Sequence, residues 1–192
     1  MFAKLKRVER KILVKWIRFA HAHQDSHWLP VFLFIALFLD GFLMVIPSIV
    51  CLIVAVTISP RRWLLFAMIL SVAMTLNNVL TYLLGRYLPT DWILTHIQNL
   101  NLEPLWNRAN HAILDYGVYA GFLGAIAGLP TQLMTAIMGI ADAHHTVDAS
   151  IGPARSIFLP AILFVFMGHL LKGLVIAILT RYGWLKLEKK FG

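Results

Sequence analysis

The chain has 192 residues, of which 59% are hydrophobic and 14% are charged, with a mean hydropathy of +0.75. Soluble domains are normally about 45–50% apolar and about 25% charged, so this composition excludes an ordinary soluble domain and predicts one integral membrane domain. The 17 Lys and Arg residues outnumber the 9 Asp and Glu residues, which gives a net charge of +8. Because most basic residues flank apolar runs near the two ends of the chain, they fit an anionic membrane surface, and we expect no nucleic-acid partner.

The first 27 residues form a basic leader with an amphipathic pattern. Apolar residues recur every three or four positions, at Leu5, Val8, Ile12, Trp16 and Phe19. A basic stripe lies one position before them, at Lys4, Arg7, Lys11, Lys15 and Arg18. The pattern predicts that residues 1–27 contain an interfacial helix on an anionic bilayer surface, with a frayed basic leader as the alternative.

Four long apolar segments follow, at residues 28–59, 63–85, 116–141 and 156–180. About 20 helical residues cross a hydrocarbon core of about 30 Å, so the second and fourth segments predict single crossings. The first segment would be about 48 Å long as one helix, and it contains Pro47, which breaks the helical hydrogen-bond ladder. The third contains Pro130 after the glycine-rich stretch GFLGAIAGL, which does not favour a straight helix.

Three basic clusters predict the orientation of these segments, because Lys and Arg in short loops mark the cytoplasmic side. The clusters hold 13 of the 17 basic residues: seven in the leader, then Arg61 and Arg62, then Arg181, Lys186, Lys189 and Lys190. If all three clusters are cytoplasmic, both termini are cytoplasmic too. The membrane domain 28–182 then consists of a re-entrant hairpin at 28–59, a crossing at 63–88, a re-entrant hairpin at 112–141 and a crossing at 154–181, followed by a basic cytoplasmic tail at 183–192.

The two halves of the membrane domain resemble each other. GFLMVIPS at 41–48 parallels GFLGAIAGLPT at 121–131, and SPRRW at 59–63 parallels GPARS at 152–156. Inverted repeats with broken helices that meet near the midplane are the usual architecture of secondary transporters. We therefore predict an all-α integral membrane protein with a transporter-like inverted repeat, two re-entrant hairpins and an N-terminal interfacial helix.

Several of these motifs, in this order, resemble the DedA family, also called VTT-domain or SNARE-associated Golgi proteins. The stretches are FLDGFLMVIPS (38–48), YLLGRYLP (82–89), DYGVYAGFLGAIAGLP (115–130) and GHLLKGLVIA (168–177), with Arg155 before the last helix. The resemblance covers roughly residues 28–182 and is greatest for the short YqaA-like branch. It implies two re-entrant hairpins that face each other in a bacterial inner membrane. It also implies translocation of a lipid carrier such as undecaprenyl phosphate, or phospholipid scrambling.

The resemblance further implies proton-coupled transport by acidic and arginine residues of the family, of which this chain keeps one clearly. Asp40 matches the first acid. The second acid is replaced by Ile49, and the arginine that follows FLG is replaced by Ala125. A further arginine of the family falls near Thr131 or Gln132.

Asp40 is the first candidate for a functional residue. A charge at the centre of a bilayer costs about 2.5–3.5 kcal/mol on insertion scales, so such a residue normally faces protein or a water-filled cavity. It would serve as a proton carrier beside Pro47, which turns the chain within the membrane. The alternative is a structural carboxylate that caps a broken half-helix.

Basic residues predict a path for an anionic headgroup. Arg86 and Arg155 would bind a phosphate through the fork of guanidinium donors, or else extend their side chains to the membrane interface. Lys172 and His169 lie on one face of the last helix because they are three residues apart. Lys172 would pair with Asp40, attract a phosphate, or extend towards the cytoplasmic face.

Two asparagines and three glycines have structural interpretations. Asn77 and Asn78 are expected to hydrogen-bond the unwound backbone around Pro47 or Pro130, with Asn78 as a site residue. The spacing of Gly121, Gly124 and Gly128 predicts close helix packing.

No metal, cofactor or enzymatic activity is expected. His144 and His145 lie near Asp142 and Asp148, but their spacing matches no zinc pattern. The sequence also contains no nucleophile elbow and no phosphate-binding loop.

The sequence therefore predicts a translocase, flippase or scramblase that moves an anionic phospholipid or a polyprenyl phosphate between leaflets, proton-coupled through Asp40. A non-transporting membrane scaffold or assembly factor is the alternative, and an intramembrane lipid-modifying enzyme ranks last. A monomer and a homo-oligomer are both compatible with the sequence.

Overall fold

The computed structural model describes residues 15, 22–23, 25–43, 48–143 and 157–191, and over these residues the chain is helical with no strand. The all-α prediction is confirmed for this part of the chain. The leader helix at 1–20, except for isolated positions, the turn that contains Pro47, and the segment that contains Arg155 lie outside the described residues.

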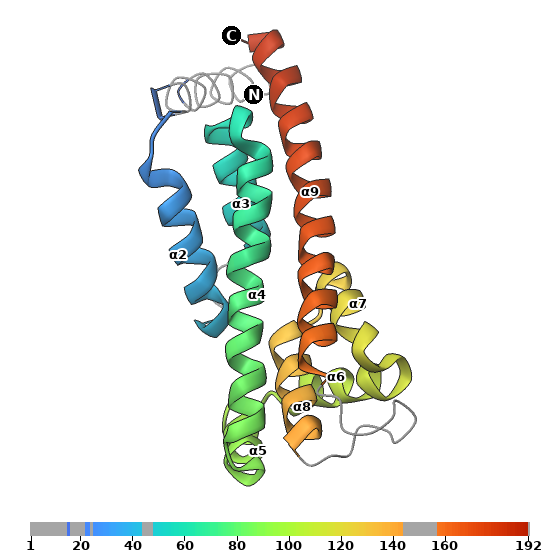
Figure 1. The fold of residues 1–192 in the computed structure, drawn as a ribbon. Helices are drawn as coiled ribbons and strands as arrows, with labels where there is room; N and C mark the ends of the chain where they lie inside the picture. The colour runs from blue at the N-terminus through green and yellow to red at the C-terminus, as the bar shows by residue number, and fades with distance from the viewer. Residues whose placement is uncertain (1–14, 16–21, 24, 44–47, 144–156, 192) are drawn as a thin grey trace, which may run out of the picture.

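A long central helix, α4, is covered along one half of its length by a pair of shorter helices (Figure 1). The chain descends through the first of the pair, returns through the second to the end where it started, and then runs through α4 to the opposite end. These elements are α2 (Trp28–Leu43), α3 (Ser48–Ile58), the short 3-10 helix η1 (Pro60–Arg62) and α4 (Trp63–Tyr87).

The second half of the chain places another pair of short helices at the other end of the molecule. Two helices lie across that end, the pair α7 and α8 extends from it towards the middle, and α9 runs back beside α4 (Figure 1). The elements are α5 (Thr90–Asn99), α6 (Glu103–Tyr116), η2 (Gly117–Tyr119), α7 (Ala120–Ala127), α8 (Thr131–Ala143) and α9 (Phe158–Phe191).

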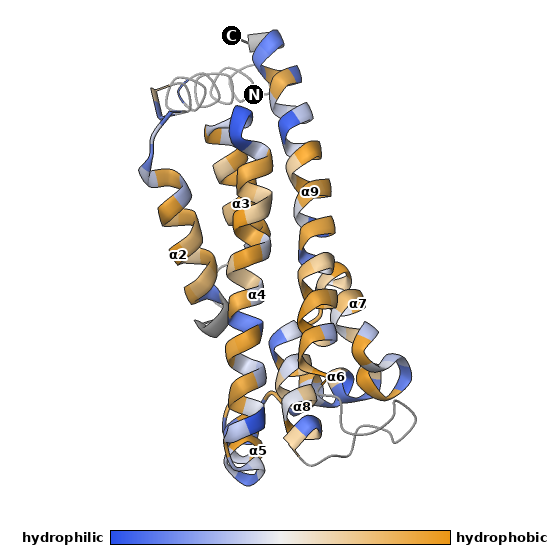
Figure 2. Cartoon of the chain, in the orientation of Figure 1, coloured by the Kyte–Doolittle hydropathy of each residue, from blue (hydrophilic) through white to orange (hydrophobic). Residues whose placement is uncertain are grey.

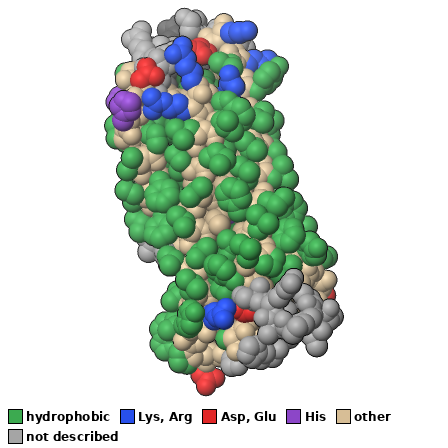
Figure 3. Space-filling view, viewed as in Figure 1, with side chains coloured by type: hydrophobic (Ala, Val, Ile, Leu, Met, Phe, Trp, Pro, Cys, Tyr) green, Lys and Arg blue, Asp and Glu red, His purple; other side chains and the backbone are tan. Residues whose placement is uncertain are grey.

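Among the described residues, two helical stretches are long and apolar enough to cross a membrane, namely Pro60–Tyr87 and Phe158–Lys189. At about 1.5 Å per residue, α2 spans about 24 Å and α3 only about 17 Å, which is less than the core of about 30 Å. An apolar belt surrounds the middle of the visible face, and charged side chains gather towards its ends (Figure 3). The predicted tail at 183–192 is not separate, because α9 continues to Phe191.

Glycine and proline end the short helices where the sequence predicts breaks. Gly128 has φ +75° and caps α7 in the left-handed region, and the amide of Leu129 donates to the carbonyl of Gly124 at 2.9 Å. Pro130 comes next, and its carbonyl accepts from Leu133 at 3.1 Å, so α8 begins at once. Gly117, with φ +57° and ψ −136°, ends α6 and begins η2 in a backbone region that favours glycine.

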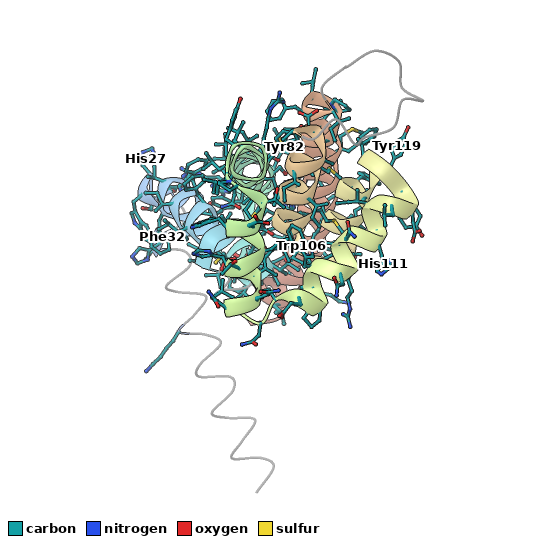
Figure 4. The ribbon with its side chains drawn as sticks, turned by 90° about the horizontal axis from the view of Figure 1, so that it is seen from below. His27, Phe32, Tyr82, Trp106, His111 and Tyr119 are labelled. Carbon is teal, nitrogen blue, oxygen red and sulfur yellow. The ribbon has the colours of Figure 1, made fainter. Side chains whose placement is uncertain are left out.

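The two helix pairs pack differently on α4. The seam of α2 consists of Leu29, Leu33 and Leu37, spaced by four, and these residues lie in one apolar cluster with α3, α4 and Ala177 of α9. By contrast, α8 approaches α4 so closely that a Cβ atom on Gly85 or Gly139 would lie 2.1 Å from a backbone oxygen of the other helix. In the axial view, Tyr82 lies in the interior while Phe32 lies at the periphery (Figure 4).

Candidate functional site

A cluster of buried polar side chains lies where α4, α8 and α9 meet. Figure 2 shows a hydrophilic band across the middle of α4, beside the end of α2. In an apolar bundle such groups need hydrogen-bond partners, because an unpaired polar group is costly there. The cluster comprises Asn77, Asn78, Thr131, Gln132, Thr135 and His169, each 8% exposed or less.

Asn78 connects α4 to both neighbouring helices. Its Nδ2 atom donates to the carbonyl of Met74 at 2.7 Å and lies 3.5 Å from Nε2 of His169 on α9. Its Oδ1 atom accepts from the hydroxyl of Thr135 on α8 at 3.2 Å. The amide therefore contacts the preceding turn of its own helix, α8 and α9 at once.

Two threonines, one turn apart at the start of α8, complete this arrangement. The hydroxyl of Thr131 lies 3.4 Å from Nε2 of His169, and that of Thr135 lies 2.7 Å from the hydroxyl of Thr81 on α4. We call the side chains of Asn78, Thr131, Thr135 and His169 the polar network. It joins three helices at the depth where α8 begins.

Asn77 contacts the other helix pair. Its Nδ2 atom donates to the carbonyl of Phe38 on α2 at 3.3 Å, and its Oδ1 atom has no partner among the described residues. The asparagines were expected to bond the unwound backbone around Pro47 or Pro130. Instead, over the described residues, Asn77 bonds a carbonyl within α2, and Asn78 bonds side chains of α8 and α9.

Asp40 lies in the last turn of α2, partly buried, two residues beyond the carbonyl that Asn77 contacts. It is close enough to Cys51 on α3 for the two groups to interact electrostatically. Asp40 therefore lies at the inner end of the first helix pair, beside the middle of α4. The structure brings it to the same depth as the polar network, although on the α2 side of α4.

Lys172 is half-buried on α9, one turn beyond His169, as their spacing predicts. Its charge acts on the imidazole of His169 electrostatically, so the two side chains share one region of the interior. Lys172 thus supplies positive charge close to the start of α8. Both Lys172 and the N-terminal end of α8, whose peptide dipoles point a positive end at this region, would attract an anion.

Arg86 has a partner that sequence reasoning did not assign to it. Its guanidinium forms an ion pair with Asp142 at the end of α8, where the two side chains are 36% and 10% exposed. The other carboxylate oxygen of Asp142 accepts from the backbone amide of Ile157 at 3.4 Å. Arg86 therefore ties the ends of α4 and α8 to the start of α9.

Pro130 lies immediately before α8, where it ends the turn after Gly128. Pro47 and Arg155 lie outside the described residues, as do His144, His145 and Asp148. Within the described part of the chain, no three His, Cys, Asp or Glu side chains are grouped as metal ligands.

Basic residues gather at the end of the molecule where α4 starts and α9 finishes (Figures 1 and 3). There the guanidinium of Arg62 donates to the carbonyls of Ser26 at 3.0 Å and Asp25 at 3.2 Å. The guanidinium of Arg181 lies 5.7 Å from the ring centre of Trp63. Two of the three predicted basic clusters are therefore at one end, which is also the end where α2 begins.

Sequence reasoning missed the threonines of α8 and the glycines that bring α8 against α4. The i, i+4 spacing of Thr131 and Thr135 within an apolar helix was a usable signal, since it puts two hydroxyls on one face. Gly85 and Gly139 lie on helices far apart in sequence, so their mutual contact had no local signal.

Comparison of the chain with protein-family models, with characterised proteins and with solved structures finds no match in any of the three.

Proposed function

We propose that this chain is a DedA-type lipid translocase of a bacterial inner membrane. In this proposal α4 and α9 cross the bilayer, while the pairs α2–α3 and α7–α8 are re-entrant hairpins. The observation that carries the proposal is the meeting of two short helix pairs from opposite ends at neighbouring asparagines of one central helix. Asn77 contacts the first pair and Asn78 contacts the second.

Helix lengths support the re-entrant assignment. Neither helix of the first pair can cross a hydrocarbon core of about 30 Å, and α7 and α8, with 8 and 13 residues, are shorter than that core as well. Irregular backbone at membrane depth is tolerated where it is buried in protein or lines a cavity. The basic end of the molecule would face the cytoplasm, because short basic loops mark that side.

The polar interior supports an anionic substrate. Polar and ionisable groups inside a membrane mark substrate or ion pathways by default. The start of α8 presents backbone N–H groups, Gln132 and the hydroxyl of Thr131, and Lys172 adds a positive charge nearby. A phosphate headgroup would pass this region while its acyl or prenyl tails stay against the exposed apolar surfaces of α4 and α9.

Asp40 supports proton coupling in this scheme. It is a partly buried carboxylate in the last turn of α2, close enough to Cys51 on α3 for the two groups to interact electrostatically. A carboxylate in this position can exchange a proton with either side as the hairpin alternates. The family resemblance places its first acid at the same residue.

The test is leaflet exchange of a labelled anionic phospholipid, and separately of a polyprenyl phosphate, in liposomes that contain the purified chain. We expect protein-dependent exchange of one of them, and we expect Asp40→Asn to slow it by about tenfold or more and to abolish its pH dependence. Asp115→Asn is the matched control, since Asp115 is exposed on α6 and should leave the rate unchanged.

An unchanged rate and pH dependence in Asp40→Asn would remove Asp40 from the mechanism. If folded protein exchanges neither lipid, the translocase proposal is wrong, and the scaffold alternative replaces it. A partner that co-purifies stably with the chain would then be the supporting finding.

A further inference from the structure

The polar network contains a titratable side chain that the proposed proton carrier does not involve. His169 is 5% exposed, and its Nε2 atom faces both Nδ2 of Asn78 at 3.5 Å and Oγ1 of Thr131 at 3.4 Å. One ring nitrogen therefore contacts α4 and the start of α8 simultaneously. A proton added to that nitrogen must alter its contact with the amide of Asn78.

The orientation of the Asn78 amide decides which form of the ring fits. Its nitrogen is identified by the carbonyl of Met74, which can only accept and lies 2.7 Å away. An amide nitrogen has no capacity to accept, so Nε2 forms a hydrogen bond with it at 3.5 Å only as the acceptor. This contact favours a neutral imidazole with its proton on Nδ1.

The Thr131 hydroxyl can reorient, because it donates and accepts equally well. It would tolerate either form of the ring. Asn78 is therefore the contact that distinguishes them, since a proton on Nε2 would direct one N–H group at another.

The surrounding groups give a protonated ring no compensation. Lys172, the nearest charge on α9, has the same sign as an imidazolium. The titratable groups on the helices packed against α9 are Cys51, Tyr82, Arg86, Tyr87, Tyr119 and Asp142, with none on α7. Asp142 is paired with Arg86, and in the described part of the chain no carboxylate forms an ion pair with His169.

We propose that His169 is a proton-dependent switch of the contact between the start of α8 and helices α4 and α9. When Nε2 takes a proton from water, it changes from acceptor to donor, opposes the amide of Asn78 and leaves the polar network. The start of α8 then loses one of its links to α9. The part that this release plays in transport rests on the proposed function, but the switch itself is a property of the helix contact.

Hydrogen–deuterium exchange of the full chain in nanodiscs tests the switch without any lipid transport. Exchange of the first two turns of α8 is followed between about pH 4 and about pH 8 and corrected for the intrinsic pH dependence of amide exchange. We expect the corrected exchange rate of these turns in wild type to rise by about tenfold on acidification. The corrected exchange rate of the first half of α4, which begins at Trp63, should change little. His169→Gln should abolish the rise, because its amide oxygen accepts from Asn78 and does not titrate.

Asp142→Asn is the matched control, because acid also weakens the Arg86–Asp142 pair that holds the far end of α8. We expect the rise at the start of α8 to persist in this variant. If His169→Gln does not fold, Asn78→Ala serves as the second variant, since it removes the donor that a protonated ring would oppose and should also suppress the rise.

A corrected wild-type rate that does not depend on pH would overturn the switch, as would a rise that survives in His169→Gln or disappears in Asp142→Asn. If the protein exchanges lipid but the corrected exchange rate of the start of α8 does not depend on pH, only the switch is refuted. A pH-dependent α8 in a protein that moves no lipid would refute only the proposed function.

Discussion

Both helix pairs contact α4, the first through α2 and α3 and the second through α8, while α7 packs on α9. They are held against α4 by different forces. The first pair packs through an apolar seam of α2 and a hydrogen bond from Asn77 to the carbonyl of Phe38. Arg62 also donates to the carbonyl of Ser26, just before α2 begins. The second pair packs by backbone approach at Gly85 and Gly139, by the polar network and by an ion pair.

In a bilayer, the two kinds of packing on α4 stabilise the helix contacts to different degrees. Lipid tails are as apolar as leucine, so an apolar seam gains little over contact with lipid, whereas close packing and interhelical hydrogen bonds still stabilise. The outer face of α2 is correspondingly open, with Val31 59% and Phe32 61% exposed. We therefore expect the second pair to be fixed on α4 and the first pair to be the more easily displaced.

The largest effect should follow from a substitution that prevents the close backbone contact between α8 and α4. A Cβ atom at Gly139 would lie 2.1 Å from the carbonyl oxygen of Tyr82, so Gly139→Ala must push α8 away from α4. We expect a loss of about 3 kcal/mol in the free energy of unfolding, measured by denaturant titration in mixed micelles. Gly183→Ala is the control, since nothing lies within 4 Å of its Cβ position, and it should be neutral or slightly stabilising. Equal stability of the two variants would contradict the close approach.

A smaller effect should distinguish the neighbouring asparagines. Asn78→Leu removes an amide that contacts both α8 and α9 and leaves Thr135 and His169 without that partner, so we expect a loss of about 2 kcal/mol. Asn77→Leu removes one contact, to a carbonyl that is already in a helix, and should cost about 0.5 kcal/mol. The same unfolding titration measures both variants. A larger loss in Asn77→Leu would reverse the ranking of the two pairs.

The arginines that hold the two pairs at opposite ends of α4 should have smaller effects than Asn78. Arg86→Gln leaves the mostly buried carboxylate of Asp142 without its cation, and we expect a cost of about 1 kcal/mol. Arg62→Gln removes hydrogen bonds to two carbonyls near the surface and should cost about half as much. The Arg86 effect should vanish in an Asp142→Asn background, which a double-mutant cycle measures. An Arg86 effect that persists there would show that the ion pair is not its cause.

Local chemistry made much of this molecule predictable. The breaks after Gly128 and before Pro130 follow from backbone geometry, because a left-handed residue followed by proline ends one helix and starts the next. The two helices that are long and apolar enough to cross a membrane follow from run length and hydropathy, which need no knowledge of neighbours. His169 and Lys172 share a region of the interior because three residues separate them on one helix.

Contacts between distant segments were not predictable in the same way. The sequence located Asn77 and Asn78 at mid-span, but their partners Phe38, Thr135 and His169 are 39, 57 and 91 residues away. The sequence also showed no sign that Arg86 pairs with Asp142, which lies 56 residues further along the chain. Such pairs depend on how α4, α8 and α9 come together, and no spacing along the chain encodes that.

The sequence by itself therefore determined the apolar character, the two longest apolar helices and the break between α7 and α8, because hydropathy, glycine and proline act within a few residues. The tertiary structure alone decided that the backbones of α8 and α4 approach closely at Gly85 and Gly139 and that His169 faces an amide nitrogen. The reason is steric and directional: a hydrogen bond or a close backbone contact requires two groups at a given distance and angle. That condition is met only when separate helices have packed.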